Sequence, residues 1–560
     1  MRSHVINSKT WSEFLELLNS GRYDQLISAA KPLLKTNGRM AELWELVGIA
    51  LLRKGDLKNA ERHLKKSLKI NPSKASAQFN LASAYFSGKQ YEAAANAFAG
   101  YLKRNPADRT ALLRFGRALL NSNQAERSKA HFEALAKSDS RNPIVWFVLA
   151  QSYKSVGQLS DALNSYRTAV EIDPKFEGAW FNLGNLHRDI DDNLEALSCF
   201  RTSLSLRPDH VPTILNVAHC HIQQGDLKTA LTWIDKAIEA DPENPEPQFV
   251  RSIPLLLSGK LKEGLAAAEA RTKLPAEYKR LYRGTQPEWD GISPLEDKHL
   301  VIYAEQGFGD TLMMLRFLEF LDLSKTRVSL IVQQGLSTLV AENFPQIDVR
   351  EFSKQMPLKP EDGLVGDYQC SLMSLAYLTR SLWSAPPTPK AYLRAPKGKM
   401  AEWAKEFNGA ERRRVGIVWR GNAMHKNDHN RSIEIETFLN SLHHDHSYVC
   451  LQKDITRTER QAIENHRSPD IMVPELGDFS DTAGLCMNLD IVVSVDTSIA
   501  HLAGSLGLPT LVLLPKNPDW RWGLATTDSY WYPTMRLFRQ AAVGEWEETL
   551  ARVMEHIGSE

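Results

Sequence analysis

The loop AEQGFGDT, residues 304–311, combines two glycines with an aspartate at a point where a strand should give way to a helix. Gly307 and Gly309 free the backbone, and the N-terminus of the helix that follows offers unpaired N–H groups to an anion. Asp310 enters that helix, where an aspartate is a routine N-cap. From these residues alone, helix capping is the first interpretation of Asp310, and catalysis is the alternative.

A second loop, within SVDTSIAHLAGSLG at residues 494–507, makes a stronger anion site. An expected strand delivers Asp496, Thr497 and Ser498 directly to a helix start, and His501 lies one turn into the helix. Backbone N–H groups and two hydroxyls that converge on a helix N-terminus form a good seat for a diphosphate, which the helix dipole stabilises. The alternative is an ordinary Asp/Thr/Ser cap.

Two further loops follow expected strands and carry cations: WRGNAMHKNDHNRS at 419–432 and LQKD at 451–454. Lys453 could neutralise a phosphate as a point charge, whereas Arg420 and Arg431 could do so through paired hydrogen bonds. Each of these residues alone would be an ordinary surface cation. Together they supply positive charge at three successive strand ends, as a nucleotide-diphosphate leaving group would require.

The elements that must position these loops are expected to form two lobes with parallel sheets. From residue 299, apolar runs such as HLVIYA and VSLIVQQ alternate with helical stretches, which indicates βαβ units. The segment SAPPTPK at 384–390 interrupts this series, and VGIVW at 415–419 opens a second one. We therefore expect two doubly wound lobes, residues 299–398 and 411–560, with a ligand cleft where the carboxyl ends of their strands face each other.

The first half of the chain repeats itself every 34 residues. Small side chains at fixed positions let paired helices approach closely, and a proline closes most units. We expect a helical solenoid over residues 41–274, with a helical cap at 1–40 and a linker at 275–298. Five positions of the repeat keep one type of residue from unit to unit: one large, two small, one apolar and one proline. In the first unit they are Trp44, Gly48, Ala60, Leu64 and Pro72.

Polar residues on the first helix of several units are candidates to line the concave face of this solenoid. Such a face suits an extended or helical polypeptide, whose backbone the asparagines could bond. The alternative is a solvated polar face without a ligand. The candidates for an acceptor groove are Asn80, Arg114, Asn182, Asn185, Asn216 and, in addition, His187.

The overall composition excludes several classes of partner. The 68 basic and 67 acidic residues leave a formal charge of +1, so no field of the whole molecule attracts nucleic acid or an anionic membrane. Five cysteines are scattered without a metal-ligand or disulfide spacing, as in a reducing compartment. No secretory signal and no membrane span is recognisable, so we expect a soluble, cytoplasmic protein without a metal site.

Taken together, these motifs and the late segment PDWRWG resemble bacterial tetratricopeptide-repeat glycosyltransferases over nearly the whole chain. Those proteins are similar to the heptosyltransferases and, more distantly, to the O-GlcNAc transferases. The resemblance implies a tetratricopeptide-repeat (TPR) solenoid followed by an α/β GT-B fold of two Rossmann-like lobes. It also implies an acceptor near the first lobe, a sugar nucleotide in the second, inversion at the anomeric carbon, and no obligatory metal or other cofactor.

Position by position, the resemblance assigns roles to the loop residues. Asp310 stands where heptosyltransferases place their general base, and Lys453 matches the lysine that steadies the departing phosphate in the O-GlcNAc transferases. The first lobe lacks the histidine that the latter carry in the corresponding loop, so their chemistry does not transfer whole. The implied donor-binding residues are Gly307, Gly309, Arg420, Asn422, Gln452, Lys453, Asp496, Thr497, Ser498 and His501.

The sequence therefore predicts a glycosyltransferase that moves a sugar from a nucleotide sugar to a Ser or Thr hydroxyl of a protein held by the repeats. A long groove suits a protein chain better than a small lipid-linked sugar, and it raises the effective concentration of the acceptor. Some bacterial enzymes with this layout modify flagellin, which is the specific candidate acceptor. The alternatives are an enzyme acting on a lipopolysaccharide or other glycan, and a scaffold whose GT-B half has lost activity.

Overall fold

The computed structural model describes residues 8–36, 38–275, 284, 286–352, 364–388, 390–407, 412–424, 427–466 and 471–559. The chain divides into two compact units, Met1–Asn216 and Val217–Glu560. The division falls inside the helix Val211–Gln223, so the last helices of the expected solenoid belong to the second unit. Of the expected linker at 275–298, residues 276–283 and 285 lie outside the described residues.

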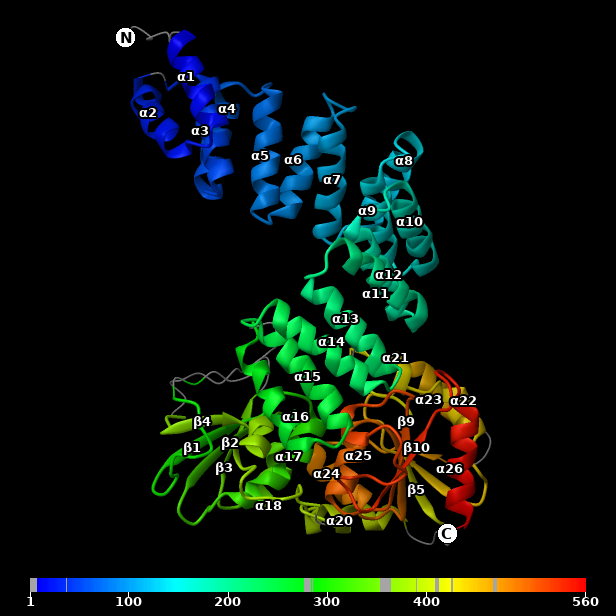
Figure 1. Ribbon diagram of the computed structural model, residues 1–560. Helices are drawn as coiled ribbons and strands as arrows, with labels where there is room; N and C mark the ends of the chain where they lie inside the picture. The colour runs from blue at the N-terminus through cyan, green and yellow to red at the C-terminus, as the bar shows by residue number, and fades with distance from the viewer. Residues whose placement is uncertain are drawn as a thin grey trace. The chain divides into compact units, whose positions relative to one another are not determined.

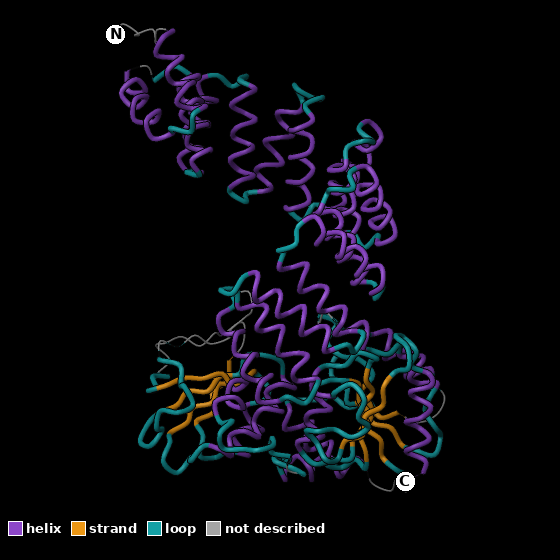
Figure 2. Tube along the Cα trace, in the orientation of Figure 1, coloured by secondary structure: helices purple, strands orange, loops and turns teal. Residues whose placement is uncertain are grey.

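The first unit is built from antiparallel helix pairs, in which each helix from α1 to α12 packs on the next (Figures 1 and 2). Several second helices begin at an aspartate N-cap, such as Asp56 before α4 and Asp192 before α12. The helices are α1 (Ser8–Asn19), α2 (Tyr23–Thr36), α3 (Ala41–Lys54), α4 (Leu57–Ile70), α5 (Ala75–Ser87), α6 (Tyr91–Leu102), α7 (Arg109–Asn121), α8 (Ala125–Ser138), α9 (Pro143–Ser155), α10 (Leu159–Ile172), α11 (Glu177–Asp189), α12 (Asn193–Leu206) and α13 (Val211–Gln223).

The glycine column and the apolar wedge column interlock within each helix pair. A Cβ added to Gly116 would lie 2.3 Å from Cε2 of Phe132, and one added to Gly184 would lie 2.6 Å from Cε1 of Phe200. Both phenylalanine rings are fully buried. The first helix of the pair therefore needs a residue without a side chain where the ring of the second helix presses against it.

The column of large residues anchors the turns between units rather than only filling the core. The indole N–H groups of Trp44, Trp146 and Trp180 donate to carbonyls six residues earlier, at 3.1, 2.8 and 2.9 Å. Gln78 uses its side-chain amide for the same bond, to the carbonyl of Pro72 at 2.8 Å. In these four units, the donor at this position fastens the first helix to the turn before it.

The second unit begins with helices α14 (Leu227–Ala240), α15 (Pro245–Leu257), α16 (Leu261–Ala268) and the 3₁₀ turn η1 (Glu269–Lys273). A four-stranded parallel sheet follows, in the order β3-β2-β1-β4, and then a six-stranded parallel sheet, in the order β10-β9-β8-β5-β6-β7. The strands are β1 (His299–Tyr303), β2 (Arg327–Gln333), β3 (Asp348–Phe352), β4 (Tyr368–Ser371), β5 (Arg414–Val418), β6 (Ser447–Cys450), β7 (Ile471–Met472), β8 (Ile491–Val495), β9 (Thr510–Leu514) and β10 (Met535–Arg539).

Both sheets reverse their strand order, between β1 and β4 in the first and between β5 and β8 in the second. The parallel sheets that the strand pattern predicted are thus present, and the order of the second is that of a doubly wound nucleotide-binding fold. Their helices are α17 (Phe308–Met314), η2 (Leu315–Phe320), α18 (Ser337–Asn343), α19 (Leu372–Leu378), α20 (Lys397–Ala404), η4 (Lys405–Phe407), α21 (Asp428–Arg431), α22 (Ile435–Asn440), α23 (Arg457–Asn465), α24 (Phe479–Cys486), α25 (Ser498–Ser505), η5 (Trp520–Trp522) and α26 (Glu547–Ser559).

One hydrophobic cluster of the second unit extends across both sheets, and a second is formed by the six-stranded sheet with α22, α23 and α26. Helices α17, α24 and α25 lie between the two sheets (Figure 1), and α17 packs directly on α25. The first cluster contains Ile302 of the first sheet and Val492 of the second, and it also takes in Leu256 and Leu265 from α15 and α16. The last solenoid helices and both sheets therefore share the first of these clusters, which fixes the loops at the strand ends relative to one another.

All five cysteines are buried, and no disulfide joins them. Within the described ranges, no helix is long and apolar enough to cross a membrane. In the same part of the chain, no three His, Cys, Asp or Glu side chains are grouped so that they could hold a metal ion.

Candidate functional site

The predicted loops lie at the strand ends where each sheet reverses its order. Residues 304–311 follow β1, residues 419–432 follow β5, and residues 496–498 follow β8. Such reversals leave a crevice at the carboxyl ends of the strands, where doubly wound proteins bind ligands. Gly309 brings the first loop against the third, because a Cβ there would lie 2.6 Å from Cδ2 of His501 on α25.

Asp310 both caps its helix and faces the second lobe. Its Oδ2 accepts the backbone N–H of Gly307 at 2.9 Å, and its Oδ1 accepts a hydrogen bond from the Arg521 guanidinium. The side chain keeps 19% of its exposure, so it is partly accessible to solvent. Burial raises the pKa of Asp310 above its ordinary value, against the charge of Arg521, which lowers it. Capping and a chemical role are therefore compatible at this residue.

Arg521 and Asp519 are site residues that the sequence reasoning missed. Arg521, in η5, bonds Asp310 of the first lobe and, at 2.5 Å, Oδ1 of Asp519 in its own lobe. Burial lowers the pKa of Arg521, but Asp310 and Asp519 outweigh this and raise it, so the guanidinium stays charged. The available signal was the segment PDWRWG, in which an arginine between two tryptophans follows an aspartate.

The start of α25 has no side-chain cap. Thr497 stands at the N-cap position with extended backbone angles, but no side-chain hydrogen bond to the helix is formed there. Its hydroxyl instead pairs with that of Ser494 at 3.0 Å. Ser498 begins the helix and is half-buried. The ordinary cap that was the alternative for this loop is thus not made by Thr497, and the first N–H groups keep their capacity for an anion.

Asp496 and Arg431 join the loops after β8 and β5. Arg431 donates through Nη1 to the carbonyl of Asp496 at 2.9 Å and through Nε to Oδ1 of Asp428 at 3.1 Å. Burial and the nearby Asp519 carboxylate raise the pKa of Asp496 to about 6, although Arg431 and Arg521 lower it. The guanidinium of Arg431 therefore serves to hold these two loops together.

This raised pKa predicts a pH dependence of stability. An aspartate titrates near 3.9 when unfolded, so between about pH 4 and pH 6 the folded protein binds a proton that the unfolded chain does not. The contribution of Asp496 to the free energy of unfolding is therefore highest at acid pH, and it declines as the pH rises through 6. Asp496→Asn should remove that decline in urea unfolding curves measured from pH 4 to pH 7. Asp528→Asn, an exposed control in the same unit, should retain it, and equal slopes in both variants would contradict the assignment.

His501 is buried rather than presented to a ligand. Its Nδ1 pairs with the hydroxyl of Tyr532 at 2.9 Å, and its ring stacks on Trp522 with centroids 5.2 Å apart. Burial and the charges of Arg521 and Arg316 lower its pKa well below the usual range, so the ring is neutral. The donor-binding role that the sequence suggested for His501 stays a prediction. His501 packs α25 against the first lobe, because its ring lies directly on Gly309, where a Cβ would be 2.6 Å from Cδ2 of His501.

The remaining predicted donor residues make protein contacts. Arg420 bonds both oxygens of Glu459, at 2.5 and 3.0 Å, so its charge is already paired. Lys453 donates to the carbonyl of Gly477 and is exposed. Gln452 accepts the backbone N–H of Arg420 at 3.4 Å, and Asn422, also exposed, accepts that of Met424 at 2.9 Å. Of these four side chains, Lys453 and Asn422 are the ones a ligand can reach most directly.

A buried ion pair ties the end of the solenoid to the loop of Asp310. Arg271, in η1, donates through Nε to Glu305 at 2.5 Å and through Nη2 to Oγ of Ser374 at 2.8 Å. The side chains of Arg271 and Glu305 are 9% and 8% exposed. Glu305 lies in the loop 304–311, so the last solenoid turn helps to fix the backbone that carries Asp310. Neither residue was singled out in the sequence.

Two of the groove candidates of the first unit, Arg114 and Asn216, bond to side chains of the neighbouring helix pair. Arg114 donates to Oγ of Ser83 at 2.7 Å, and Asn216 donates to Oδ1 of Asn185 at 2.7 Å. Each pair joins a first helix to the first helix of the preceding unit. Asn182 bonds the carbonyl of Gly178 in its own helix, at 2.7 Å, and Asn80 is half-buried. His187 is buried beside Asp192 and does not belong to this row.

Family models identify the helical repeats. Residues 12–75 and 48–109 match one model described as a tetratricopeptide repeat, and residues 191–249 match a second with the same description. Residues 150–190 match a model described as a TPR repeat. The first half of the chain is therefore a tetratricopeptide-repeat solenoid, as its period predicted.

Among curated proteins, the chain is similar to protein FlbA of Caulobacter vibrioides, with 26% identity over 355 residues. The match covers 59% of this chain and 58% of FlbA, so the chain spans somewhat more than half of that relative. Among solved structures, MamA of Desulfovibrio magneticus RS-1 is 23% identical and covers 30% of this chain and 97% of its own, with a TM-score of 0.29. A tetratricopeptide repeat protein from Parabacteroides merdae is 14% identical and covers 44% and 96%, with a TM-score of 0.37.

Proposed function

We propose that this protein is an inverting glycosyltransferase that moves a sugar from a nucleotide sugar to a Ser or Thr hydroxyl of a protein. The observation that carries the proposal is the pairing of two features on helices that pack together. Asp310, a partly exposed carboxylate with a raised pKa, belongs to α17, and an N-terminus without a side-chain cap belongs to α25. A base and an anion seat are the two parts that glycosyl transfer to a hydroxyl requires.

In the proposed reaction, Asp310 takes the proton of the acceptor hydroxyl while its oxygen attacks the anomeric carbon. The bond between that carbon and the nucleotide diphosphate breaks, and the diphosphate leaves with the bonding electrons from the opposite face. The N–H groups at the start of α25 and the positive end of its dipole stabilise the charge that develops on the phosphate. Each oxygen of Asp310 retains a lone pair beyond its bonds to Gly307 and Arg521 and can accept the acceptor hydroxyl.

The tetratricopeptide repeats support a protein as the acceptor. Repeats of this kind are protein-interaction scaffolds, and binding a chain along them places its hydroxyls at high effective concentration for transfer. Flagellin is the acceptor that we put forward first. The GT-B assignment, the sugar-nucleotide donor and the independence from metal belong to the same proposal. A glycan acceptor and a scaffold without activity are the two competing functions.

A thermal-shift screen with UDP-, GDP-, ADP- and CMP-sugars tests the donor site. We expect one nucleotide class to raise the melting temperature of the full chain, because binding to the folded state alone stabilises it by about 2.7 kcal/mol at a ligand concentration 100 times Kd. Failure of all four classes would contradict a donor site.

A chain that begins at residue 209, before α13, separates the two acceptor classes when the same screen is combined with a transfer assay. The donor shift should persist, because α14 to α16 and Arg271 are kept with the sheets. Transfer to a protein acceptor should be lost if the repeats hold it. Undiminished transfer to a glycan by this shortened chain would favour a glycan acceptor.

A further inference from the structure

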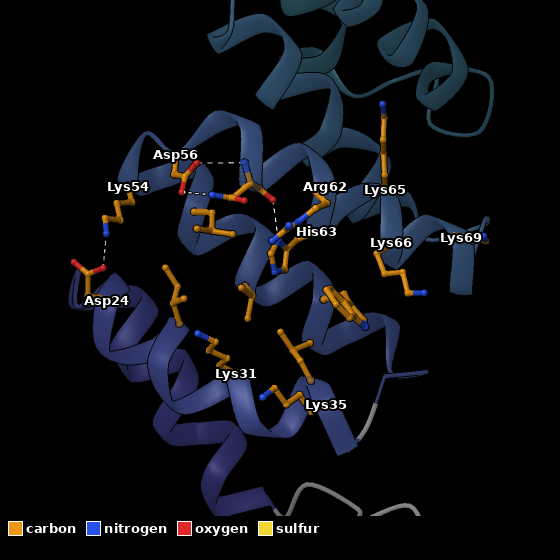
Figure 3. Close-up of a pocket in the computed structure, with 16 residues that line it drawn as sticks. Asp24, Lys31, Lys35, Lys54, Asp56, Arg62, His63, Lys65, Lys66 and Lys69 are labelled. Atoms are coloured by element: carbon orange, nitrogen blue, oxygen red, sulfur yellow. Dashed lines mark hydrogen bonds and ion pairs between the residues drawn. The ribbon is translucent and has the colours of Figure 1, made fainter.

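The first unit contains a pocket of about 750 Å³ between its first two helix pairs (Figure 3). It is lined by the second helices α2 and α4, with α3 beneath them. The predicted acceptor groove lies on first helices instead, at positions such as Asn80 on α5 and Arg114 on α7. The pocket is therefore a separate surface, and its volume lies in the usual range of ligand sites.

We call this cavity the basic pocket because lysines and an arginine line its rim. Its floor is apolar. Val47 and Leu51 of α3 are buried, and Ile27, Leu34 and Trp44 are half-buried around them. The Trp44 ring lies against His63, with centroids 5.1 Å apart, and its indole N–H is used by the carbonyl of Gly38. The floor therefore offers contact area without polar groups that need a ligand, which suits the burial of apolar side chains.

The rim is strongly cationic. Seven Lys and Arg side chains and two carboxylates line the pocket, in a chain whose basic and acidic residues are nearly balanced. Figure 3 shows Lys31 and Lys35 of α2 on one side of the pocket and Arg62 and Lys66 of α4 on the other, and all four are exposed. Like charges gathered in this way repel one another, and a ligand with carboxylates would relieve that repulsion.

Both carboxylates of the pocket are already engaged within the protein. Asp24 forms an ion pair with Lys54. Asp56 caps α4, where it accepts the backbone N–H of Asn59 at 3.2 Å and its side-chain amide at 2.7 Å, and these bonds lower the pKa of Asp56. Neither acid is positioned to neutralise Lys35 or Lys66. Of the seven rim cations, Lys54 is thus paired with Asp24, and Lys65 is paired with Glu61 at 2.7 Å. Among the described residues, the remaining five form no ion pair, so their charge is left for a ligand: Lys31, Lys35, Arg62, Lys66 and Lys69.

We propose that the basic pocket binds an acidic amphipathic segment of a partner protein, with its apolar side chains on the floor and its carboxylates paired to the rim. Charge complementarity selects acidic residues, and the half-buried Ile27, Leu34 and Trp44 select a peptide over a bare polyanion, whose phosphates would leave that apolar surface uncovered. The long stems of the rim lysines extend the apolar walls. This site is independent of glycosyl transfer.

The test is fluorescence anisotropy of the full chain with a labelled synthetic helix that carries Leu and Phe along one face and Glu and Asp elsewhere. We expect saturable binding that weakens with salt. Lys35→Glu combined with Lys66→Glu should weaken it by at least about tenfold, because two attractive charges become repulsive. Lys103→Glu combined with Lys137→Glu, an equal charge change at exposed positions elsewhere in the first unit, should leave it within about twofold.

Two further arms decide the chemistry of the ligand. A peptide with Ser in place of Leu and Phe should bind at least about tenfold more weakly, since the floor contacts are lost, and tripolyphosphate should not displace the original peptide. Equal binding of the Ser peptide, or displacement by tripolyphosphate, would make this an anion site and overturn the proposal. So would absence of binding, or equal losses in the two double variants. The thermal shift by the nucleotide sugar should be unchanged in both variants, so this proposal and the proposed function can fail separately.

Discussion

Replacing Asp310 with Asn is expected to lower kcat/KM for sugar transfer by about 10² to 10⁴-fold, the usual contribution of a general base. Asparagine has nearly the same shape, and its carbonyl oxygen can still accept the Gly307 N–H that Asp310 accepts at 2.9 Å. It cannot take a proton from a hydroxyl. The nucleotide sugar should still raise the melting temperature, because the helix start of α25 is unchanged.

Asp322→Asn provides a matched control, since Asp322 is an exposed aspartate of the same lobe. Its transfer rate should equal that of the unaltered protein. Normal transfer by the Asp310→Asn protein would show that another group removes the proton. Loss of the donor shift together with transfer would instead mean that Asp310 acts by holding the lobes together through Arg521.

The second large effect is expected at Arg521. Arg521→Ala leaves Asp310 and Asp519 without the cation between them, and breaking a buried ion pair from one side costs about 3–5 kcal/mol. At about 2–4 °C per kcal/mol for a large domain, the melting temperature of the second unit should fall by roughly 6–20 °C. Urea unfolding followed by tryptophan fluorescence measures the free energy directly.

The same variant should shift the pH profile of transfer. The charge of Arg521 lowers the pKa of Asp310, so its removal raises that pKa further, and the base becomes active only at higher pH. Arg521→Lys keeps the charge but loses the planar fork that reaches both carboxylates, so it should recover the pH profile better than the stability. Arg536→Ala, an exposed arginine on β10, is the control. An unchanged melting temperature in Arg521→Ala would contradict the interlobe role.

Much of the architecture followed from the period of the sequence. The 34-residue repeat predicted tetratricopeptide units because Gly116 and Phe132, or Gly184 and Phe200, contact each other inside a single helix pair. The alternation of strands and helices after residue 299 predicted the parallel sheets for the same reason, since each βαβ unit is local. Contacts that lie within one repeating unit require similar residues at the same positions of every unit, so they are visible as a repeat in the sequence.

The sequence predicted which loops carry the candidate site, but it did not predict which residues of these loops contact other parts of the chain. The strand-to-helix loops after β1, β5 and β8 carry recognisable glycines, hydroxyls and carboxylates. Nothing in those loops shows that Arg521 bonds Asp310 from 211 residues away, or that Arg271 secures Glu305. The donor-binding roles of His501 and Arg420 stay predictions, but their contacts with Tyr532 and Glu459 could not be predicted, because those partners lie on other elements.

The amino-acid sequence by itself therefore determined which elements form, where the helix pairs interlock, and which loops follow the strands. Only the tertiary structure decided which charges meet: the Asp310–Arg521–Asp519 bridge, the start of α25 without a side-chain cap, and the cationic rim between α2 and α4. The physical reason is the distance along the sequence over which each kind of interaction acts. Backbone propensity and apolar periodicity act over a few residues, whereas the pairing and burial of a charge depend on chain segments brought together only by the closed core.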